Sequence, residues 1–297
     1  MNPFTHKLAL GTVQFGLDYG ISNARGQVPT HEVKQILRLA AKAGVQTLDT
    51  AYAYGNSEKV LGTCLPDVPD GNFKLISKFP PGHNLPPIAE ILGKSLDRLG
   101  QKSLYAYLFH SLETYQQQPQ SWEMMQALKA EGKIQKIGFS LYAPKDALAL
   151  LESGKKAGLS LDLIQVPFSI LDQRWAEVFP RLKTAGVEIH VRSAFLQGLV
   201  FRDPSALDAH FALAQPALKH LNTLSQELNL PVSALCLGFA LRQPEIDQVV
   251  IGVANPAQFQ ENLEMVARIA EIEPIMQELK TLAITDEQIL LPMNWPK

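Results

Sequence analysis

Eight short apolar runs recur along the chain, and their spacing constrains its fold more than any other feature. Most of them are rich in Ile, Leu and Val and show little polar alternation, which is typical of strands buried on both faces, as in parallel sheets. The expected strands are Leu8–Thr12, Thr47–Thr50, Phe73–Ser77, Leu104–Phe109, Lys136–Phe139, Leu161–Val166, Val187–Val191 and Gln248–Gly252.

Stretches with helical spacing lie between these runs, and several end at a glycine just before the next run. Gly44, Gly132 and Gly186 occupy such positions. The first of these expected helices carries its apolar residues on one face: Val33, Ile36, Leu37 and Ala40. The recurring order of helix, glycine and strand predicts βα units, and their number predicts an α/β fold of the (β/α)8 TIM-barrel type.

Two stretches interrupt this rhythm. Residues 204–229 read as an insertion followed by a long helix between the seventh and eighth strands. Residues 273–297 contain a further helix and a final segment that can fold over the mouth of a barrel. Since no repeat, linker or low-complexity tract is visible, we expect residues 1–297 to form a single barrel domain.

Composition and charge exclude several classes of partner. The net charge is -2 with both signs interspersed, so neither nucleic acid nor an anionic membrane is an expected partner. Cys64 and Cys236 lie in apolar, helix-like contexts, where buried free thiols are the expected state. No apolar run reaches the roughly 18 residues needed to cross a bilayer, and the first residues lack a signal-peptide pattern. We expect a cytoplasmic protein, and the sequence leaves its oligomeric state open.

Four chemically complementary side chains come at or just past the ends of three consecutive expected strands: Asp49, Tyr54, Lys78 and His110. In a parallel barrel these strand ends converge on the face that carries the chemistry. Tyr54 can protonate the alkoxide formed when a carbonyl is reduced, provided that its pKa falls from about 10. We expect the ammonium of Lys78 to lower that pKa, Asp49 to hold the lysine, and His110 to donate a hydrogen bond to the carbonyl oxygen.

Each of these residues also has a purely structural interpretation. Asp49 can cap the following turn, Tyr54 can be a packed loop aromatic, Lys78 a solvated loop charge, and His110 a hydrogen-bonded residue at a strand end. Taken singly, these interpretations compete well with the catalytic one. The combination at matched strand ends favours catalysis.

The same residues carry a resemblance to a known family. Residues 49–58 read Asp-Thr-Ala-x-x-Tyr-Gly-x-Ser-Glu, which resembles the signature of the aldo-keto reductases. Lys78 and His110 match the remaining members of that family's catalytic tetrad, and the likeness extends from Gly11 to Asn262. The resemblance implies a (β/α)8 barrel that binds an extended nicotinamide dinucleotide at its C-terminal face, with Tyr54 as the acid.

The resemblance also implies a set of cofactor contacts. Ser140 and Gln165 would hold the carboxamide of the nicotinamide, and Glu261 and Asn262 would contact the adenosine end. The complete expected set is Gly11, Thr12, Asp49, Ser140, Gln165, Arg192, Gly252, Gln258, Glu261 and Asn262. No Gly-x-Gly-x-x-Gly follows a strand, which agrees with a cofactor that is not bound in the Rossmann manner.

The sequence departs from the family pattern at several of these positions. Leu141 replaces an asparagine, and Arg192 replaces a tyrosine that often stacks on the nicotinamide. Arg192 can stack on a flat ring itself, or can bind the pyrophosphate or an acidic substrate. Gly252 and Gln258 stand where members that prefer NADPH often have lysine and arginine. Since many members with glycine still use NADPH, we expect NADP(H) to be narrowly preferred over NAD(H).

The leading functional hypothesis is an NAD(P)H-dependent oxidoreductase, an aldo-keto reductase or alcohol dehydrogenase acting on a small-molecule carbonyl that ranges from a small aldehyde to a sugar. A nicotinamide-binding regulatory or redox-sensing subunit is the alternative, and a lyase or epimerase is a third possibility. The histidines show no His-Glu-x-x-His spacing, so no metal site is expected. The sequence also lacks a Gly-x-Ser-x-Gly elbow, so a hydrolase is not expected. Candidates for the substrate pocket are Phe15, Tyr19, Tyr52 and Trp295.

Overall fold

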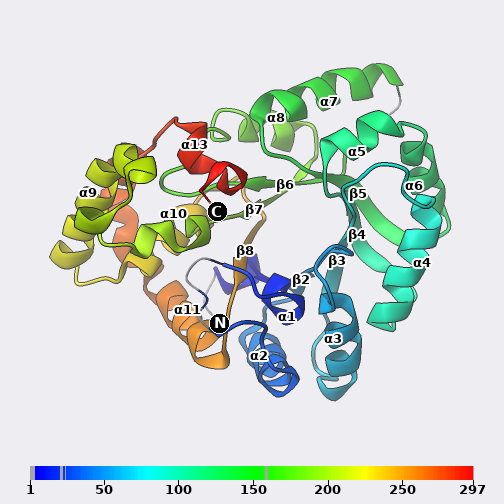
Figure 1. The fold of residues 1–297 in the computed structure, drawn as a ribbon, viewed down its shortest axis with the longest axis horizontal. Coiled ribbons are helices and arrows are strands. Elements are labelled where there is room, and N and C mark those ends of the chain that lie inside the picture. The colour runs from blue at the N-terminus through cyan, green and yellow to red at the C-terminus, as the bar shows by residue number, and fades with distance from the viewer. Residues whose placement is uncertain (1–3, 21–22, 24, 158–159, 297) are drawn as a thin grey trace.

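A computed structural model describes residues 4–20, 23, 25–157 and 160–296. Eight parallel strands close into a barrel in chain order, each pairing with the next and the last with the first (Figure 1). The predicted (β/α)8 fold is confirmed. The strands are β1 (Leu8–Gly11), β2 (Thr47–Asp49), β3 (Lys74–Phe79), β4 (Leu104–Phe109), β5 (Ile134–Ser140), β6 (Leu163–Pro167), β7 (Glu188–Arg192) and β8 (Gln248–Gly252).

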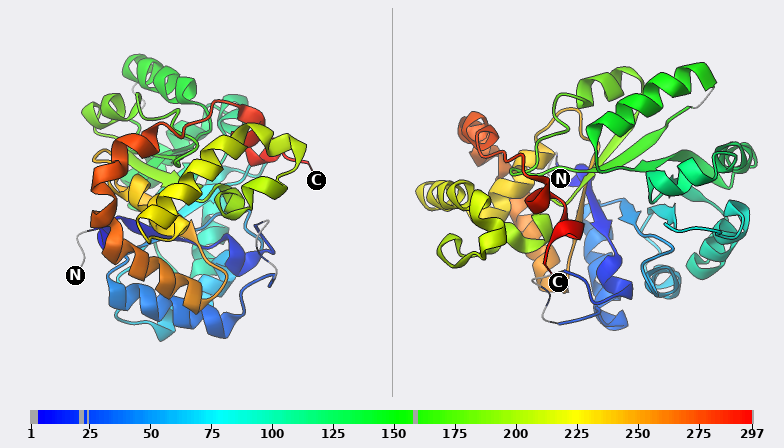
Figure 2. Two further views of the ribbon diagram at one scale, coloured as in Figure 1. Left: turned by 90° about the vertical axis from the view of Figure 1, so that its left-hand side faces the viewer. Right: turned by 45° about the horizontal axis from the view of Figure 1, so that its top comes forward.

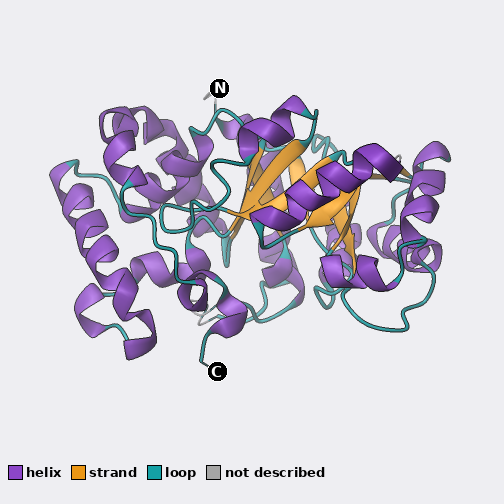
Figure 3. Ribbon diagram, turned by 90° about the horizontal axis from the view of Figure 1, so that it is seen from above, coloured by secondary structure: helices purple, strands orange, loops and turns teal. Residues whose placement is uncertain are grey.

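Helices cover the outside of this barrel (Figure 3). The α-helices are α1 (Val13–Gly16), α2 (Thr30–Ala43), α3 (Ser57–Cys64), α4 (Ile88–Leu99), α5 (Leu112–Gln117), α6 (Ser121–Ala130), α7 (Pro144–Ala157), α8 (Phe179–Thr184), α9 (Gln215–Glu227), α10 (Val232–Leu241), α11 (Pro256–Arg268), α12 (Met276–Lys280) and α13 (Glu287–Leu290). The 3-10 helices are η1 (Thr5–Lys7), η2 (Leu65–Asp67), η3 (Leu196–Phe201), η4 (Pro204–Ala206), η5 (Ala209–Ala214), η6 (Ile269–Ile275) and η7 (Pro292–Asn294).

Helix α2 illustrates how the sequence pattern becomes structure. The apolar face predicted for it is the face that the helix buries, because residues three and four apart share one side of an α-helix. The helix ends at Gly44, whose φ of 80° lies in the left-handed region that glycine adopts at little cost. The chain then turns directly into β2.

The strands alternate between the barrel interior and the helical layer. A small apolar cluster comprises Ile76, Ala106, Leu108 and Leu163. Their neighbours along the strands belong instead to the large core under the helices, among them Leu75, Tyr107, Phe109 and Ile164. Since side chains alternate along a strand, the small cluster fills the interior of the barrel. The polar residues Lys78, His110 and Gln165 occupy the same inward-facing register, nearer the carboxyl ends of β3, β4 and β6.

The strand boundaries differ from the predicted ones by a few residues. β3 continues to Phe79, so Lys78 lies within the strand, where it pairs with Leu108. A charged side chain does not interrupt the backbone ladder when it points into the barrel. β5, β6 and β7 likewise run on to Ser140, Pro167 and Arg192. The polar residues expected just past the strand ends are therefore held by the sheet itself.

The insertion and the tail pack against each other at one side of the barrel. The insertion folds into η4, η5 and α9, and the tail into α12, α13 and η7. Figure 2 shows the C-terminal segment in red against the yellow-green helices of the insertion. The rings of Trp295 and Phe211 meet edge to face with their centres 5.0 Å apart, and Trp295 donates a hydrogen bond to the carbonyl of Ile289. Trp295 is thus part of the contact between the insertion and the tail.

Cys64 and Cys236 are buried free thiols, as predicted. Within the described residues, no single helix is long and apolar enough to cross a membrane. Ala209–Glu227 and Val232–Leu241 pass that test only as a pair bent by 100°.

Candidate active site

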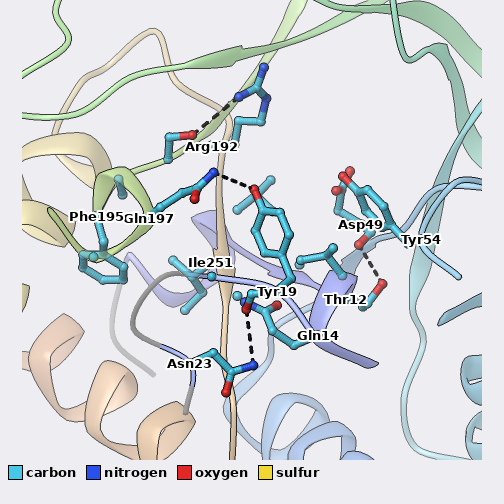
Figure 4. A pocket seen from close by; sticks show the side chains of 18 of the residues that line it. Thr12, Gln14, Tyr19, Asn23, Asp49, Tyr54, Arg192, Phe195, Gln197 and Ile251 are labelled. Atoms are coloured by element: carbon cyan, nitrogen blue, oxygen red, sulfur yellow. Dashed lines mark hydrogen bonds between the residues drawn. The ribbon is translucent and has the colours of Figure 1, made fainter. Parts of the chain in front are cut away.

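A cavity of about 370 Å³ opens at the carboxyl ends of the strands (Figure 4). This volume falls in the range of small-molecule sites. Most of the predicted site residues line it: Gly11, Thr12, Asp49, Tyr54, His110, Ser140, Gln165, Arg192, Gly252 and Gln258. Lys78, Glu261 and Asn262 do not belong to its lining. In Figure 4, Asp49 and Tyr54 lie on one side of the cavity and Arg192 and Gln197 on the other.

Asp49 and Lys78 form a closed ion pair beside the cavity. Lys78 is fully buried, and its Nζ donates to the two carboxylate oxygens of Asp49 at 2.7 and 2.8 Å and to the carbonyl of Thr50 at 2.9 Å. The Nε2 of Gln165 also donates to Asp49, at 2.7 Å. Burial lowers the pKa of Lys78, and Asp49 opposes that shift. All three protons of the ammonium are thus engaged.

Tyr54 keeps its hydroxyl free of this network. In the described part of the chain no hydrogen bond reaches that hydroxyl, and the Lys78 Nζ lies 5.2 Å from the centre of the ring. Burial raises the pKa of Tyr54 well above its usual value, the Asp49 carboxylate adds to that shift, and Arg192 opposes it. The predicted net lowering of this pKa is wrong, because burial of the phenol is the largest influence and raises the pKa. Tyr54 therefore holds a proton at neutral pH.

His110 lies next to Tyr54 and carries no charge. The two rings meet edge to face with their centres 5.5 Å apart. Burial first, and then the charges of Lys78 and Arg192, lower the pKa of His110 to about 3. Its Nδ1 is buried and has no partner among the described residues. A neutral imidazole offers one N–H donor and one acceptor, which suits the predicted role at a carbonyl oxygen.

The turn that carries Tyr54 is braced from the loop after β1. The Ser57 Oγ lies 2.8 Å from both the hydroxyl and the carbonyl oxygen of Thr12, and the Thr12 hydroxyl also donates to the carbonyl of Asp49 at 2.9 Å. A Cβ at Gly16 would come within 1.9 Å of the Tyr54 carbonyl oxygen, so only glycine permits this approach. The hydroxyl of Thr12, a predicted cofactor contact that lines the cavity, is thus hydrogen-bonded to the turn that carries Tyr54.

Glu58, the last residue of the signature, has a structural role. Its side chain is buried and accepts hydrogen bonds from Ser77 at 2.7 Å and from Arg98 at 3.2 Å. The Arg98 guanidinium in turn lies 4.3 Å from the centre of the Tyr52 ring. These contacts tie α3 to β3 and α4 behind the site. Tyr52 is thus part of the packing and does not line the cavity.

Of the four aromatic residues predicted for the substrate pocket, Tyr19 alone is part of the cavity lining. Its hydroxyl accepts a hydrogen bond from Gln197 at 3.1 Å. Phe15 is fully buried in the core, and Trp295 packs in the tail. Sequence reasoning missed Tyr142, which does line the cavity. Its position two residues after Ser140, at the end of β5, was the available signal.

Arg192 is a charged residue of the cavity lining that no carboxylate of the described chain neutralises. Its guanidinium lies 4.2 Å from the centre of the Tyr142 ring, and its Nη1 is 3.5 Å from the Ser193 hydroxyl. Its Nη2 is buried without a hydrogen-bond partner, and Arg192 forms no ion pair with any residue that the structure describes. The stacking on Tyr142 fixes the plane of the guanidinium at the cavity wall.

The loop after β8 forms the other end of the cavity. The Gln258 side chain accepts a hydrogen bond from the backbone of Ala254 at 2.7 Å, and Gly252 faces the amide of Gln14. Arg25 reaches this loop from the first βα connection, donating to the Ala254 carbonyl at 3.3 Å while it pairs with Glu32. Sequence reasoning missed Gln14 and Arg25, because neither lies at a strand end.

Glu261 and Asn262 lie further along α11, outside the cavity lining. Glu261 is exposed and Asn262 is buried. The contacts expected of them with the adenosine end of a cofactor remain a prediction. Among the described residues, no group of His, Cys, Asp and Glu is arranged to hold a metal ion.

Comparison with known proteins identifies the family of this chain. The model of the aldo/keto reductase family matches residues 7–276. The chain belongs to this family. It is 27% identical over 267 residues to the NADH-specific methylglyoxal reductase of Escherichia coli (strain K12), covering 75% of this chain and 79% of that protein. It is 25% identical over 315 residues to the L-galactose dehydrogenase of Arabidopsis thaliana, covering 97% and 94%.

Solved structures show the same fold. An aldo-keto reductase from Bacillus halodurans, in its holo form, superposes with a TM-score of 0.72 at 23% identity, covering 95% of each chain. Family membership and relatives named as reductases and dehydrogenases identify this aldo-keto reductase as an oxidoreductase.

Proposed function

We propose that this protein interconverts an aldehyde or ketone and the corresponding alcohol with NAD(P)H, and that Tyr54 is the general acid. The observation that carries the proposal is the arrangement of the four predicted side chains at one end of the cavity. Asp49 and Lys78 are hydrogen-bonded to each other, whereas Tyr54 and His110 face the cavity with polar atoms that have no partner among the described residues. An acid and a hydrogen-bond donor directed at the same space suit a carbonyl oxygen.

The cavity walls fit a nicotinamide, the cofactor that this family uses. Ser140 and Gln165 are paired in register on β5 and β6, so their side chains lie side by side. The Gln165 Nε2 is already bound to Asp49, which leaves its Oε1 to accept from the amide group of a nicotinamide carboxamide. When bound, the reduced nicotinamide supplies the hydride.

The protein's own part in the reaction is to hold and move one proton. Because its pKa is raised, Tyr54 enters the reaction as a neutral phenol, ready to donate to the oxygen of a carbonyl that gains negative charge. The neutral imidazole of His110 can donate a hydrogen bond to the same oxygen and so fix its position. Lys78, 5.2 Å from the tyrosine ring, is close enough to stabilise the phenolate that remains after proton transfer.

The test of this proposal is Tyr54→Phe, assayed by the loss of nicotinamide absorbance with a panel of small aldehydes and sugars. We expect turnover to fall roughly 10²- to 10⁴-fold, the usual contribution of a positioned acid, while cofactor affinity stays nearly unchanged. Tyr105→Phe, outside the cavity lining, is the matched control and should keep full turnover. Unchanged turnover in Tyr54→Phe would remove Tyr54 as the acid.

We also propose that NADP(H) is narrowly preferred over NAD(H). Gly252 and Gln258 supply no positive charge for a 2′-phosphate, but the exposed guanidinium of Arg25 lies at the same loop. Relatives differ in this respect: one is named NADH-specific and another, 29% identical over 143 residues, is named NAD/NADP-dependent. Calorimetric titration with NADPH and NADH ranks the two, and tighter binding of NADH would reverse the preference.

The remaining parts of the proposal concern substrate and setting. Relatives named for L-galactose and for D-threo-aldose support a sugar-like carbonyl as the first substrate class to screen. The mixed surface charge supports a small-molecule substrate without nucleic acid or membrane partners. The two free thiols support a reducing, cytoplasmic setting.

A further inference from the structure

The cavity contains a positive charge that the protein leaves uncompensated. Asp49 is the acidic residue of the lining, and Lys78 neutralises it at 2.7 Å. His110 is uncharged near neutral pH, since its pKa is about 3. Burial raises the pKa of Tyr19 and Tyr54, so neither phenol ionises. Arg192 is then the source of a net charge of about +1 at this site.

The position of that charge is fixed by the sheet and by Tyr142. β6 and β7 pair so that Gln165 lies opposite His190 and Pro167 opposite Arg192. Arg192 is therefore one pleat beyond Gln165, towards the mouth of the barrel. Its guanidinium rests on the Tyr142 ring at 4.2 Å, and its buried Nη2 has no protein partner among the described residues. The charge stands beside the proposed carboxamide site.

We propose that Arg192 makes this site bind the reduced nicotinamide in preference to the oxidised form, an inference that rests on the proposed function. The reduced ring is neutral, whereas the oxidised ring is a cation. A fixed guanidinium in a partly buried wall repels the cationic ring and tolerates the neutral one. A tyrosine, which the family often has at this position, would present a ring face that attracts cations. The arginine reverses the sign of that interaction.

This preference has a consequence for direction. In a mixture of both forms the reduced cofactor occupies the site, and the oxidised form leaves more readily after transfer. Both effects favour use of the protein as a reductase. The substrate does not enter the argument, so binding alone tests it.

The experiment is a set of calorimetric titrations with the reduced and the oxidised form of each dinucleotide. The ratio of the two dissociation constants is taken within the NADP pair and within the NAD pair, so the contribution of the 2′-phosphate cancels. Arg192→Met removes the charge and Arg192→Lys keeps it. Arg181→Met removes an exposed charge on α8, outside the cavity lining, and controls for net charge.

We expect the wild-type protein to bind the reduced form more tightly and Arg192→Met to lower the ratio of oxidised to reduced dissociation constants about tenfold, as loss of one close charge interaction implies. Arg192→Lys should keep most of the ratio and Arg181→Met all of it. An unchanged ratio in Arg192→Met overturns the inference and leaves the proposed function standing. Equal weakening of both forms also overturns it and assigns Arg192 to the pyrophosphate. If the wild-type protein binds no form, the proposed function fails as well.

Discussion

The two ends of the barrel carry the same kinds of residue in different states. At the carboxyl ends of the strands lie an acid, a tyrosine, a lysine and a histidine: Asp49, Tyr54, Lys78 and His110. Near the amino ends of the strands lies a second such set: Glu188, Tyr105, Lys136 and His190. Residue type alone therefore does not explain why one end faces a cavity suited to chemistry.

At the amino end, the carboxylate of Glu188 contacts the side chains of the other three residues of the set. Tyr105 donates to it at 2.8 Å, the His190 Nε2 lies 2.6 Å away, and Lys136 forms an ion pair with it. Burial raises the pKa of Glu188, but the hydrogen bonds from His190, Lys136 and Tyr105 outweigh burial and lower it to about 2. The Tyr105 hydroxyl donates its hydrogen bond to the Glu188 carboxylate. The polar side chains at this end are therefore bound to one another.

At the carboxyl end, Asp49 binds Lys78 and Gln165 but not the tyrosine. Tyr54 keeps its proton and faces the cavity, and the His110 Nδ1 has no protein partner there. The His190 Nδ1 also lacks a partner in the described chain, yet His190 is not part of the cavity lining. The two ends therefore differ in whether the tyrosine hydroxyl is bound by a carboxylate or left unpaired next to a cavity, as the proposed role of Tyr54 requires.

Removal of the lysine at each end should have the largest effect on stability. Lys78→Met leaves the nearly inaccessible Asp49 without its cation, so we expect the free energy of unfolding to fall by about 3–5 kcal/mol. Lys136→Met acts on a pair whose lysine side chain is 33% exposed and whose carboxylate keeps two other donors, so a loss of about 1 kcal/mol is expected. Urea unfolding at pH 7 measures both.

A double variant shows whether the unpaired charge is the cause. Adding Asp49→Asn to Lys78→Met removes the stranded carboxylate and should recover part of the lost stability. Equal losses for the two lysine variants, or no recovery in the double variant, would contradict the assignment of a tightly coupled pair at the carboxyl end only.

The two ends should also respond to pH in different windows. The pKa of His110 is about 3 in the folded protein and about 6.5 when unfolded. The contribution of the neutral His110 to the free energy of unfolding is therefore fully present above pH 6.5. It is lost as the pH falls towards 3, because the unfolded chain takes up the proton at a higher pH than the folded protein does. The loss is about 1.4 kcal/mol per pH unit. For Glu188, with a folded pKa of about 2 against 4.5, the loss begins only below pH 4.5.

Between pH 6 and pH 5 these two groups can be separated. His110→Gln should flatten the decline of the unfolding free energy by about 1.4 kcal/mol per pH unit, whereas Glu188→Gln should leave the slope as in the wild-type protein. Urea titrations at pH 7, 6 and 5 supply the slopes. A change of slope in Glu188→Gln, with none in His110→Gln, would show that the two windows have been assigned to the wrong ends.

The fold and the four side chains at or just past the strand ends could be predicted from the sequence because they depend on local patterns, whereas the other predicted residues of the cavity lining were implied by the resemblance to the aldo-keto reductases. Buried parallel strands read as apolar runs, and polar residues at their ends stand out. The strand ends were less accurate, since β3 continues past Lys78 when that side chain points into the barrel. The signature residues 49–58 were taken together as one motif, although Glu58 contributes to the packing behind the cavity.

What escaped prediction depends on pairing between distant strands. Glu188 on β7 meets Lys136 on β5 and Tyr105 on β4 only because the barrel closes. The same closure brings Gln165 to Asp49 and leaves Arg192 on Tyr142 without a carboxylate. The direction of the Tyr54 pKa shift was missed because its largest cause is burial in the closed barrel, followed by the Asp49 carboxylate.

Removal of the tyrosine hydroxyl at each end should have smaller effects on stability than removal of the lysines. Tyr105→Phe removes a hydrogen bond of 2.8 Å to a charged carboxylate, which is worth about 1.5–3 kcal/mol of stability. Tyr54→Phe removes a hydroxyl that has no hydrogen bond in the described chain, so the unfolding free energy should change by less than about 0.5 kcal/mol. Turnover and stability should thus separate: one variant loses activity and keeps stability, and the other does the reverse. A marked loss of stability in Tyr54→Phe would mean that the hydroxyl is paired in solution and that the two ends are more alike than their geometry indicates.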